Sequence, residues 1–305
     1  MKGRQNIPIK LNSISELHNA LGFPKPLHPL ISVVGYDKIN MDEGIASSSL
    51  ILNFYKISYK KNLSGKIRYG QNYYDFNEGG MFFVSPNQLL VSDEDDKDYA
   101  GYTLLIHPDF LRNHPLGKNI KKYGFFSYSA NEGLHLSEKE REIIVSIFGN
   151  IERELNNTID DFSQDVMISH IEVLLNYSNR FYKRQFITRK AVNNGLLAKM
   201  EVLLNEYFDR EEAINNGLPT VEHLAAQLNV SPRYLSDMLR SLTGQSAQQH
   251  IHDKLIEKAK EYLTATSLSV SEIAYQLGFE HSQSFNKLFK KKTNLTPIAF
   301  KQSFN

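Results

Sequence analysis

The segment LAAQLNVSPRYLSDMLRSLTGQSA, residues 224–247, recurs in altered form as IAYQLGFEHSQSFNKLFKKKTNLTP, residues 273–297. The copies align with an offset of about 49 residues before a central break and about 50 after it. Each copy predicts an apolar-periodic helix, a short break and a second helix with a basic face. This is the layout of a helix-turn-helix motif, whose second helix can enter the DNA major groove. Two copies indicate one polypeptide that contacts two successive groove segments. The aligned pairs are Leu224 with Ile273, Ala225 with Ala274, Leu228 with Leu277, Val230 with Phe279, Leu235 with Phe285, Leu239 with Phe289 and Thr243 with Thr293.

The first copy predicts a motif over about 220–242. Thr220 starts its first helix, and Asn229 lies at the break, where a left-handed backbone is tolerated. Ser231 is a strong N-cap, and Pro232 stands at the first helical position, where a missing N–H costs nothing. The outer face of the second helix then carries the candidate DNA-binding residues Arg233, Ser236, Asp237 and Arg240.

The second copy predicts a motif over about 271–292, with Ser271 at its start and Gly278 at its turn. Gln and Asn side chains can bind adenine in a bidentate manner, and Lys can reach guanine or a phosphate. Lys291 and Lys292 end the helix and suit a phosphate or the helix dipole. The candidate DNA-binding residues of this copy are Ser282, Gln283, Asn286, Lys287, Lys290 and Lys291.

A helix is also expected between the copies, over 248–263, with Ile251, Leu255, Ala259 and Leu263 on one stripe. At 1.5 Å per residue it would be about 24 Å long. A rod of this length can hold two reading helices roughly one DNA turn apart, about 34 Å.

Charge is distributed unevenly along the chain. The net charge is +1, but from Leu218 onward there are 10 Lys and Arg against 7 Asp and Glu, which leaves −2 for the rest. No acidic residue follows Glu280. A terminal region of one sign is typical of a surface that faces a polyanion, although a solvated lysine face gives the same count.

The N-terminal two thirds predict strands and then helices. Short β-branched and aromatic runs at intervals of about 10–15 residues between His28 and His107 indicate an antiparallel barrel or sandwich. Ser137 with Glu140 predicts a capping box that opens a helix. A further helix over 163–183 has a broad apolar stripe that includes Ile171 and Leu174, so one side could contact a second subunit; ordinary core packing explains it equally well. The polar segment 189–195 suggests a linker.

From about residue 220 onward the chain resembles the DNA-binding domain of AraC/XylS-type transcriptional regulators. The second motif carries the more specific match. The chain departs from the family pattern at Lys254, Asn294 and Lys301, where Arg, Gly and Arg are usual. Asp237 occupies a position that is often basic in the family, so it costs DNA affinity unless it reads cytosine or pairs with Arg233 or Arg240. The matching residues are Leu224, Ala225, Ser231, Leu235, Leu239, Gly244, Ala259, Leu263, Glu272, Ile273, Ala274, Gly278, Phe279, Phe285, Phe289, Lys290, Lys291 and Pro297.

The N-terminal region is similar to the cupin-like sensor domain often attached to this module. The fold expected is therefore a two-domain α+β chain: a cupin-like antiparallel β-barrel followed by helices over 1–190, and an all-α tandem helix-turn-helix domain over 196–305. The resemblance implies a regulator that binds double-stranded promoter DNA as a homodimer, contacts RNA polymerase and responds to a small molecule. Tyr55, Tyr69 and Tyr73 are candidate effector-binding residues, although barrel tyrosines more often belong to a core or strand surface.

The alternative is a small-molecule binding protein or cupin-type enzyme with an accessory helical domain. Against an enzyme, the sequence has no nucleophile elbow, P-loop or dinucleotide fingerprint. His28 and His107 lack the spacing of a metal cupin, so no metal and no cofactor are expected. Cysteine is absent, which excludes disulfides and thiolate sites. The N-terminus has no secretion signal and no apolar run reaches roughly 18 residues, so we expect a cytoplasmic protein without a membrane span.

Overall fold

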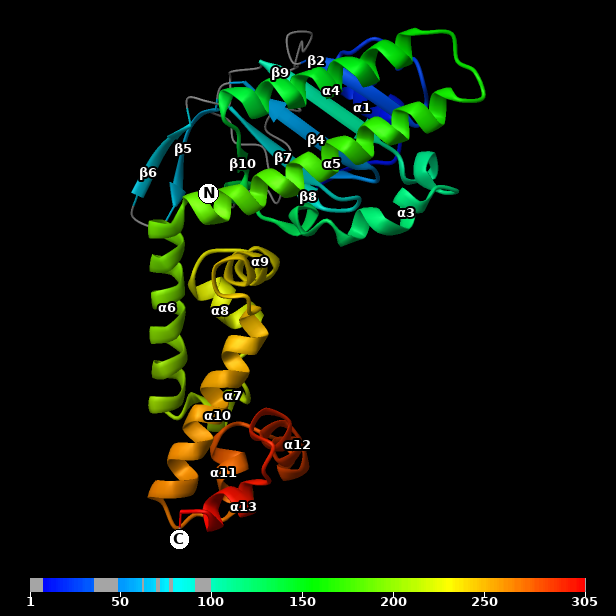
Figure 1. Cartoon of the computed structure of the whole chain (residues 1–305). Helices are drawn as coiled ribbons and strands as arrows, with labels where there is room; N and C mark the ends of the chain where they lie inside the picture. The colour runs from blue at the N-terminus through cyan, green and yellow to red at the C-terminus, as the bar shows by residue number, and fades with distance from the viewer. Residues whose placement is uncertain are drawn as a thin grey trace, which may run out of the picture. The chain divides into compact units, whose positions relative to one another are not determined.

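The computed structural model describes residues 8–35, 49–61, 63–69, 72–76, 79–90 and 100–304. The chain divides into two compact units, Met1–Gln185 and Phe186–Asn305 (Figure 1). The linker expected over 189–195 is wrong, because these residues lie within or next to the helix α6 (Lys190–Asp209). Asn193 is buried and its amide nitrogen donates to the carbonyl of Phe186 over 2.7 Å. A polar residue that suggested a loop therefore serves the start of a helix.

The first unit contains the strands expected from the sequence, together with a short N-terminal strand and helix. Within the described residues the strands fall into three sheets with the orders β1-β3-β8, β10-β7-β4-β9-β2 and β5-β6. The strands are β1 (Ile9–Leu11), β2 (Ile31–Gly35), β3 (Leu50–Leu52), β4 (Tyr55–Lys60), β5 (Leu63–Tyr69), β6 (Asn72–Phe76), β7 (Gly80–Val84), β8 (Leu89–Leu90), β9 (Gly101–Ile106) and β10 (Leu134–His135).

The strands predicted as an antiparallel barrel or sandwich do not close into a barrel within the described residues. The sheets remain separate, and β1 pairs with β3 in parallel, with Ile9 opposite Leu50. The edge strand β10 is only two residues long because Ser137 begins the helix α4 (Glu138–Asn156) directly after it. The unit is a mixed α+β fold whose central sheet stays open.

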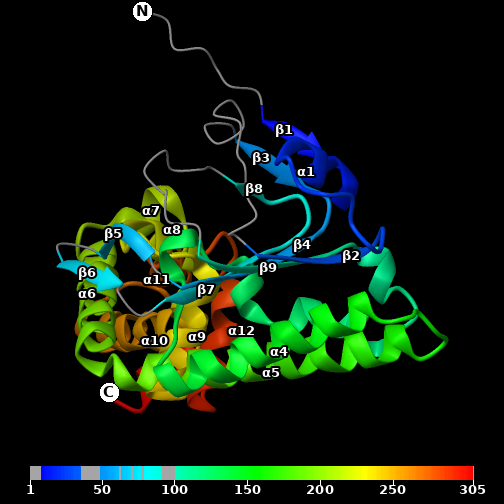
Figure 2. The same ribbon diagram turned by 90° about the horizontal axis from the view of Figure 1, so that it is seen from above.

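The central five-stranded sheet is covered on both faces. Figure 2 shows α4 and α5 (Ser163–Thr188) side by side on one face, and β1, β3, β8 and α1 (Ile14–Ala20) on the other. Leu105 of β9 packs with Leu11, Ile14 and Phe54 in the apolar cluster on the second face. Burial on two sides explains why β9 reads as a nearly continuous apolar run.

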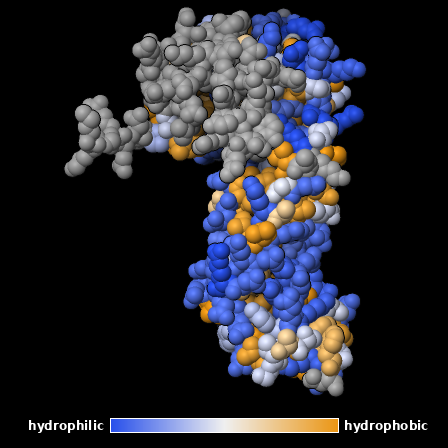
Figure 3. All heavy atoms as spheres, turned by 90° about the vertical axis from the view of Figure 1, so that its left-hand side faces the viewer, coloured by the Kyte–Doolittle hydropathy of each residue, from blue (hydrophilic) through white to orange (hydrophobic). Residues whose placement is uncertain are grey.

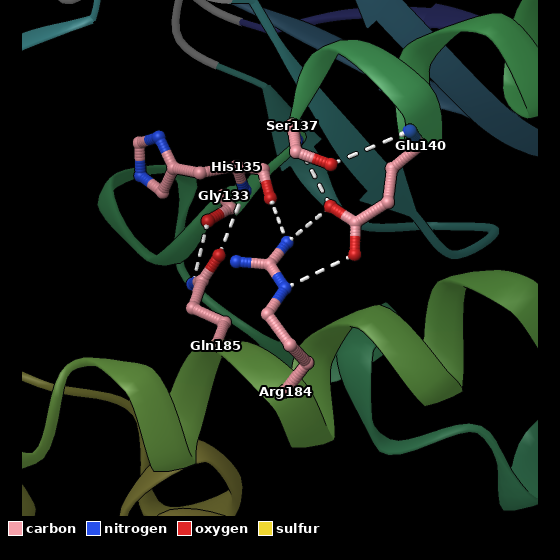
Figure 4. Close-up of polar contacts among 6 residues, drawn as sticks. All are labelled: Gly133, His135, Ser137, Glu140, Arg184 and Gln185. Atoms are coloured by element: carbon pink, nitrogen blue, oxygen red, sulfur yellow. Dashed lines mark hydrogen bonds and ion pairs between the residues drawn. The ribbon is translucent and has the colours of Figure 1, made fainter.

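The helices α4 and α5 run antiparallel, and an ion pair joins the start of α4 to the end of α5. Arg184 places Nη2 2.6 Å and Nε 3.1 Å from the carboxylate of Glu140, and Nη2 also donates to the carbonyl of His135 (Figure 4). Glu140 also completes the predicted capping box with Ser137. Gln185 accepts from the backbone of His135 and donates to the carbonyl of Gly133. These bonds hold the last residues of the first unit against β10.

Ile171 and Leu174 of α5 are fully buried within the first unit. The interpretation of the broad stripe as a subunit contact through these two residues is therefore wrong, because the core occupies that face. The exposed apolar residues on or beside this helix are Phe162, Val166, Val173 and Ile187.

In the second unit, all the regular secondary structure of the described residues is helical. Its apolar core includes Phe285 and Phe289, both fully buried, and each stabilises the unit by about 1.5–3 kcal/mol. The face shown in Figure 3 is mostly hydrophilic over this unit, with separate hydrophobic patches. The helices are α6, α7 (Glu212–Asn216), α8 (Val221–Gln227), α9 (Pro232–Thr243), α10 (Ala247–Ala265), α11 (Val270–Gln276), α12 (Ser282–Thr293) and α13 (Pro297–Gln302).

Candidate nucleic-acid interface

The break of the first motif, between α8 and α9, has the geometry that the sequence predicts. Asn229 adopts φ 55°. Its N–H donates to the carbonyl of Ala226 over 3.2 Å, and the N–H of Val230 donates to the carbonyl of Ala225 over 3.0 Å. This pair of bonds is a Schellman ending, which turns the chain sharply after α8. Ser231 then caps α9 by accepting from the N–H of Tyr234.

The second motif, α11 and α12, repeats these bonds atom for atom. Gly278 adopts φ 88°, its N–H donates to the carbonyl of Tyr275 over 2.9 Å, and the N–H of Phe279 donates to Ala274 over 3.0 Å. A Cβ on Gly278 would lie 2.6 Å from the carbonyl carbon of Gly217. The loop before the first motif therefore packs directly on the turn of the second.

The repeat also extends to the ends of the second helices. The hydroxyl of Thr243 donates to Leu239 and that of Thr293 donates to Phe289, both over 2.8 Å. The C-caps Gly244 and Asn294 are both left-handed, at φ 78° and 62°. Asn294 thus fills the role of the expected glycine.

The linker helix α10 lies between the motifs and contacts helices of both (Figure 1). Its 19 residues make it about 28 Å long, slightly longer than the expected helix. The predicted stripe Ile251, Leu255, Ala259 and Leu263 is buried, and Ile256 joins it.

The four candidates on α9 form one polar surface. Asp237 accepts from Arg233 at 2.9 Å (Nε to Oδ2) and from Arg240 at 3.2 Å (Nη1 to Oδ1). The Asp237 side chain is 18% exposed, whereas those of Arg233 and Arg240 are 50% and 56% exposed. Ser236 is half-buried beside them. The carboxylate therefore lies beneath two guanidinium groups that face solvent.

On α12 the structure exposes Gln283, Asn286, Lys287, Lys290 and Lys291, and half-buries Ser282. The opposite side of the helix packs against the core through Phe285 and Phe289. In the described part of the chain, no acidic side chain lies within ion-pair distance of Lys287, Lys290 or Lys291. Amide and cationic groups thus form one continuous surface along this helix.

Three contacts position the second motif, and the last of them corrects its expected start. Lys292 is exposed like its neighbours, but its Nζ lies 2.7 Å from Oδ1 of Asp253 on α10. Lys301 donates to the carbonyls of Thr266 and Leu268 and so closes the end of α10. The second motif starts at Ser269, whose capping box with Glu272 replaces the expected start at Ser271.

Tyr234 contributes to the packing of α9, although the apolar pattern of the sequence did not reveal it. Its ring is buried on α9 and packs edge-on against Phe186, with ring centroids 5.2 Å apart. The spacing of Tyr234 four residues before the buried Met238 was the available signal. The packed face of the reading helix is therefore wider than expected.

These paired motifs have counterparts in known proteins. Residues 224–303 match the model of a helix-turn-helix domain family. Over 85 residues the chain is 36% identical to an uncharacterised HTH-type transcriptional regulator in the cgkA 5′ region of Pseudoalteromonas carrageenovora, which covers 28% of this chain and 50% of that protein. Over 141 residues it is 29% identical to the HTH-type transcriptional activator RhaS of Salmonella schwarzengrund, which covers 46% of each.

Residues 224–303 form an AraC-type helix-turn-helix domain. The matched segment starts in α8 and includes both breaks, both second helices and α10. A helix-turn-helix domain of this kind binds DNA. The chain spans half or less of the length of the two curated relatives. The C-terminal domain of AraT, a response regulator from Geobacillus stearothermophilus, is 29% identical and covers 35% of this chain and 84% of that one, with a TM-score of 0.32.

Outside the AraC-type domain, the three candidate tyrosines do not lie in one sheet. Tyr55 is on β4, is 7% exposed and packs edge-on against Phe126, and burial raises its pKa. Tyr69 and Tyr73 lie on the separate ribbon β5-β6, and their side chains are outside the described residues. Effector binding by these residues stays a prediction.

The described residues also bear on two other properties, metal binding and membrane insertion. No group of three or more His, Asp or Glu side chains in them is placed to hold a metal ion. None of the helices described combines the length and the apolar character that crossing a bilayer requires.

Proposed function

We propose that this protein is a sequence-specific, DNA-binding transcriptional regulator that reads two successive major-groove segments with α9 and α12. The observation that carries the proposal is the repetition, bond for bond, of the helix-turn-helix geometry, with polar and cationic side chains on the outer face of each second helix. An enzymatic role has no support of this kind, and we assign none.

The roles of the interface residues follow from their chemistry. Asn286 and Gln283 present amides that can bind adenine in a bidentate manner, and Arg233 can bind guanine. Lys291 contacts phosphate, because it stands at the end of α12, where a cation approaches the DNA backbone. The remaining members of the proposed interface are Ser236, Asp237, Arg240, Ser282, Lys287 and Lys290.

The proposal extends to the whole chain. Residues 1–190 would form a cupin-like sensor for a small molecule, with Tyr55, Tyr69 and Tyr73 as candidate contacts, and residues 196–305 the DNA-binding domain. The protein would act in the cytoplasm and contact RNA polymerase at the promoter. This assignment rests on the AraC-type domain and on the partial match to RhaS, a named transcriptional activator.

A homodimer would place two such domains on one operator, and we propose that Val166 and Val173 of α5 contribute to its interface. Their side chains are 39% and 41% exposed, whereas Ile171 and Leu174 are fully buried. Val166→Glu combined with Val173→Glu should give folded monomers in light scattering at micromolar concentration. If the wild-type protein is monomeric with and without DNA, the dimer proposal is wrong.

The DNA proposal is tested by selecting duplexes from a randomised pool with the full-length protein. A shared sequence with two half-sites about 10 base pairs apart is expected, because α9 and α12 would read adjacent major grooves on one face. Recovery of no shared sequence, together with equal affinity for all duplexes, would exclude sequence-specific reading.

A further inference from the structure

One carboxylate connects the two helix-turn-helix motifs. Asp253 lies on α10 and accepts from Lys292 Nζ at 2.7 Å through Oδ1 and from Gln245 Nε2 at 3.0 Å through Oδ2. Gln245 follows the left-handed C-cap of α9, and Lys292 lies in the last turn of α12. Each oxygen of Asp253 thus binds the C-terminal end of a different reading helix.

The register of α12 aims Lys292 at this carboxylate. Lys292 follows Leu288 by four residues and Phe289 by three, so it lies next to the packed side of the helix although the residue itself is exposed. Its side chain is 28% exposed. Both residues are exposed, but Lys291 stands about 100° away from Lys292 around the helix, so the two neighbouring lysines have different surroundings.

Neighbouring groups leave this contact intact near neutral pH. His252 lies beside it, and burial together with the positive charge of Lys292 lowers the pKa of its imidazole, which is therefore neutral at pH 7.5. Lys254, on the same helix, pairs with Glu257 at 3.0 Å and does not compete for Asp253.

We propose that Asp253 is a positioning residue that fixes the distance and rotation between α9 and α12 and so sets which half-site spacing the domain accepts. This inference rests on the proposed function. One base pair shifts the second half-site by about 3.4 Å and about 35°. If the two reading helices are fixed relative to each other, the domain loses DNA contacts under that shift. If they are not fixed, the helices can move to keep those contacts. By holding Lys292, Asp253 also removes one cation from sequence-independent binding to phosphates.

The variants that test this role are Asp253→Asn, Lys292→Gln and the double variant. Glu261→Gln is the matched control for Asp253→Asn, because it removes the same charge from the same helix and its partner Lys258 keeps an ion pair with Asp209 at 2.9 Å. Lys291→Gln is the matched control for Lys292→Gln, because it removes the same charge one residue away.

The measurement is the affinity of the full-length protein for three probes: a duplex selected by the wild type from a randomised pool, the same duplex with one base pair inserted between the half-sites, and a scrambled duplex. The wild type should lose at least about tenfold on the inserted duplex. Asp253→Asn and Lys292→Gln should lose only about threefold, and the double variant no more than either single one, since both break one contact. Asp253→Asn should also bind scrambled DNA more tightly, with a salt slope steeper by about one unit, because Lys292 becomes available to a phosphate.

The controls should keep the wild-type ratio between selected and inserted duplexes, although Lys291→Gln weakens binding to all three. The proposal is overturned if Asp253→Asn keeps the wild-type ratio. It is also overturned if Asp253→Asn weakens all three probes equally with a lower melting temperature, which is the signature of a purely structural role. If the wild type binds the selected and the scrambled duplex equally well, the proposed function itself is wrong. This outcome differs from those that overturn only the role of Asp253.

Discussion

At the scale of single residues, Asp237 is the group that most changes how the first reading helix works. It lies beneath Arg233 and Arg240 and accepts from both. The sequence already allowed this pairing, because the spacings of four and three residues put all three side chains on one helix face. The structure supports pairing with arginine over direct reading of cytosine, the two possibilities that the sequence left open.

Asp237→Ala should therefore increase affinity for scrambled DNA a few-fold and reduce the preference for the selected site. Two guanidinium groups lose their fixed partner and become free to contact phosphates, so the salt slope should steepen by about one to two units. Glu222→Ala, which removes an exposed carboxylate on α8 outside the proposed interface, is the control and should change neither slope nor ratio by this amount. Relaxed preference at a single base pair with an unchanged salt slope would show instead that Asp237 reads a base.

Asn286 and Lys291 separate base reading from phosphate contact on α12. Asn286→Ala should cost about 1–3 kcal/mol on the selected duplex and little on scrambled DNA, because it removes a base-edge contact. Lys291→Ala should weaken both duplexes about equally and lower the salt slope by roughly one unit. Binding titrations of both variants over a range of salt concentrations make the comparison. If Asn286→Ala loses affinity equally on both duplexes, α12 contacts phosphates and does not read bases.

Lys60, at the end of β4, makes stability depend on pH. Burial, with the positive charge of Lys56 nearby, lowers the pKa of its ammonium group to about 8. Between pH 8 and the unfolded value of 10.5 the unfolded chain binds more protons than the folded one, so the free energy of unfolding should rise with pH in that window. Lys60→Met should remove this rise in denaturant titrations, and Lys56→Met should largely keep it. An identical pH profile for wild type and Lys60→Met would contradict the assignment.

At the scale of elements, two left-handed glycines of the AraC-type domain, Gly278 in the turn of the second motif and Gly244 at the end of α9, differ in how much room they leave for a side chain. Gly278 adopts φ 88° and approaches Gly217, so a side chain meets both backbone strain and a backbone clash. Gly244 has a similar φ of 78°, but a Cβ at this residue would have no neighbouring heavy atom within 4 Å.

Gly278→Ala should therefore lower the free energy of unfolding by about 2 kcal/mol or more, and Gly244→Ala by about 1 kcal/mol. Denaturant titration of the full chain, followed by helical circular dichroism, measures both. The order of the two losses is the decisive result, and equal losses would mean that the contact between Gly217 and Gly278 has no energetic weight.

The sequence predicted the second unit in detail and the first unit only in outline. The breaks at Asn229 and Gly278 and the cap at Ser231 follow from local rules, and the repeat supplied an internal check on each. The start at Ser269 was also accessible, because Ser269 and Glu272 have capping-box spacing. Lys292 lies in the last turn of α12, as the sequence predicts, but its ion pair with Asp253 was not predicted, because it joins segments that are far apart in the chain.

At the scale of the whole molecule, topology set the limit of prediction. Periodicity finds strands but not their partners, so the parallel pairing of β1 with β3 and the separate ribbon β5-β6 were outside its reach. The broad stripe of α5 raised the same problem, since buried Ile171 and exposed Val173 are equally apolar in the sequence. The fold of the first unit depends on contacts between distant segments, whereas the paired motifs depend on contacts within a few residues.

The central claim is that α9 and α12 of one chain enter two successive major grooves. Protection of guanine N7 from methylation tests it most directly, because N7 lies in the major groove. On a selected duplex, each DNA-binding domain should protect two clusters of guanines about 10 base pairs apart on one face of the DNA, and Asn286→Ala should lose protection in only one cluster of each pair. Protection of a single cluster, or uniform protection along the duplex, would contradict the account.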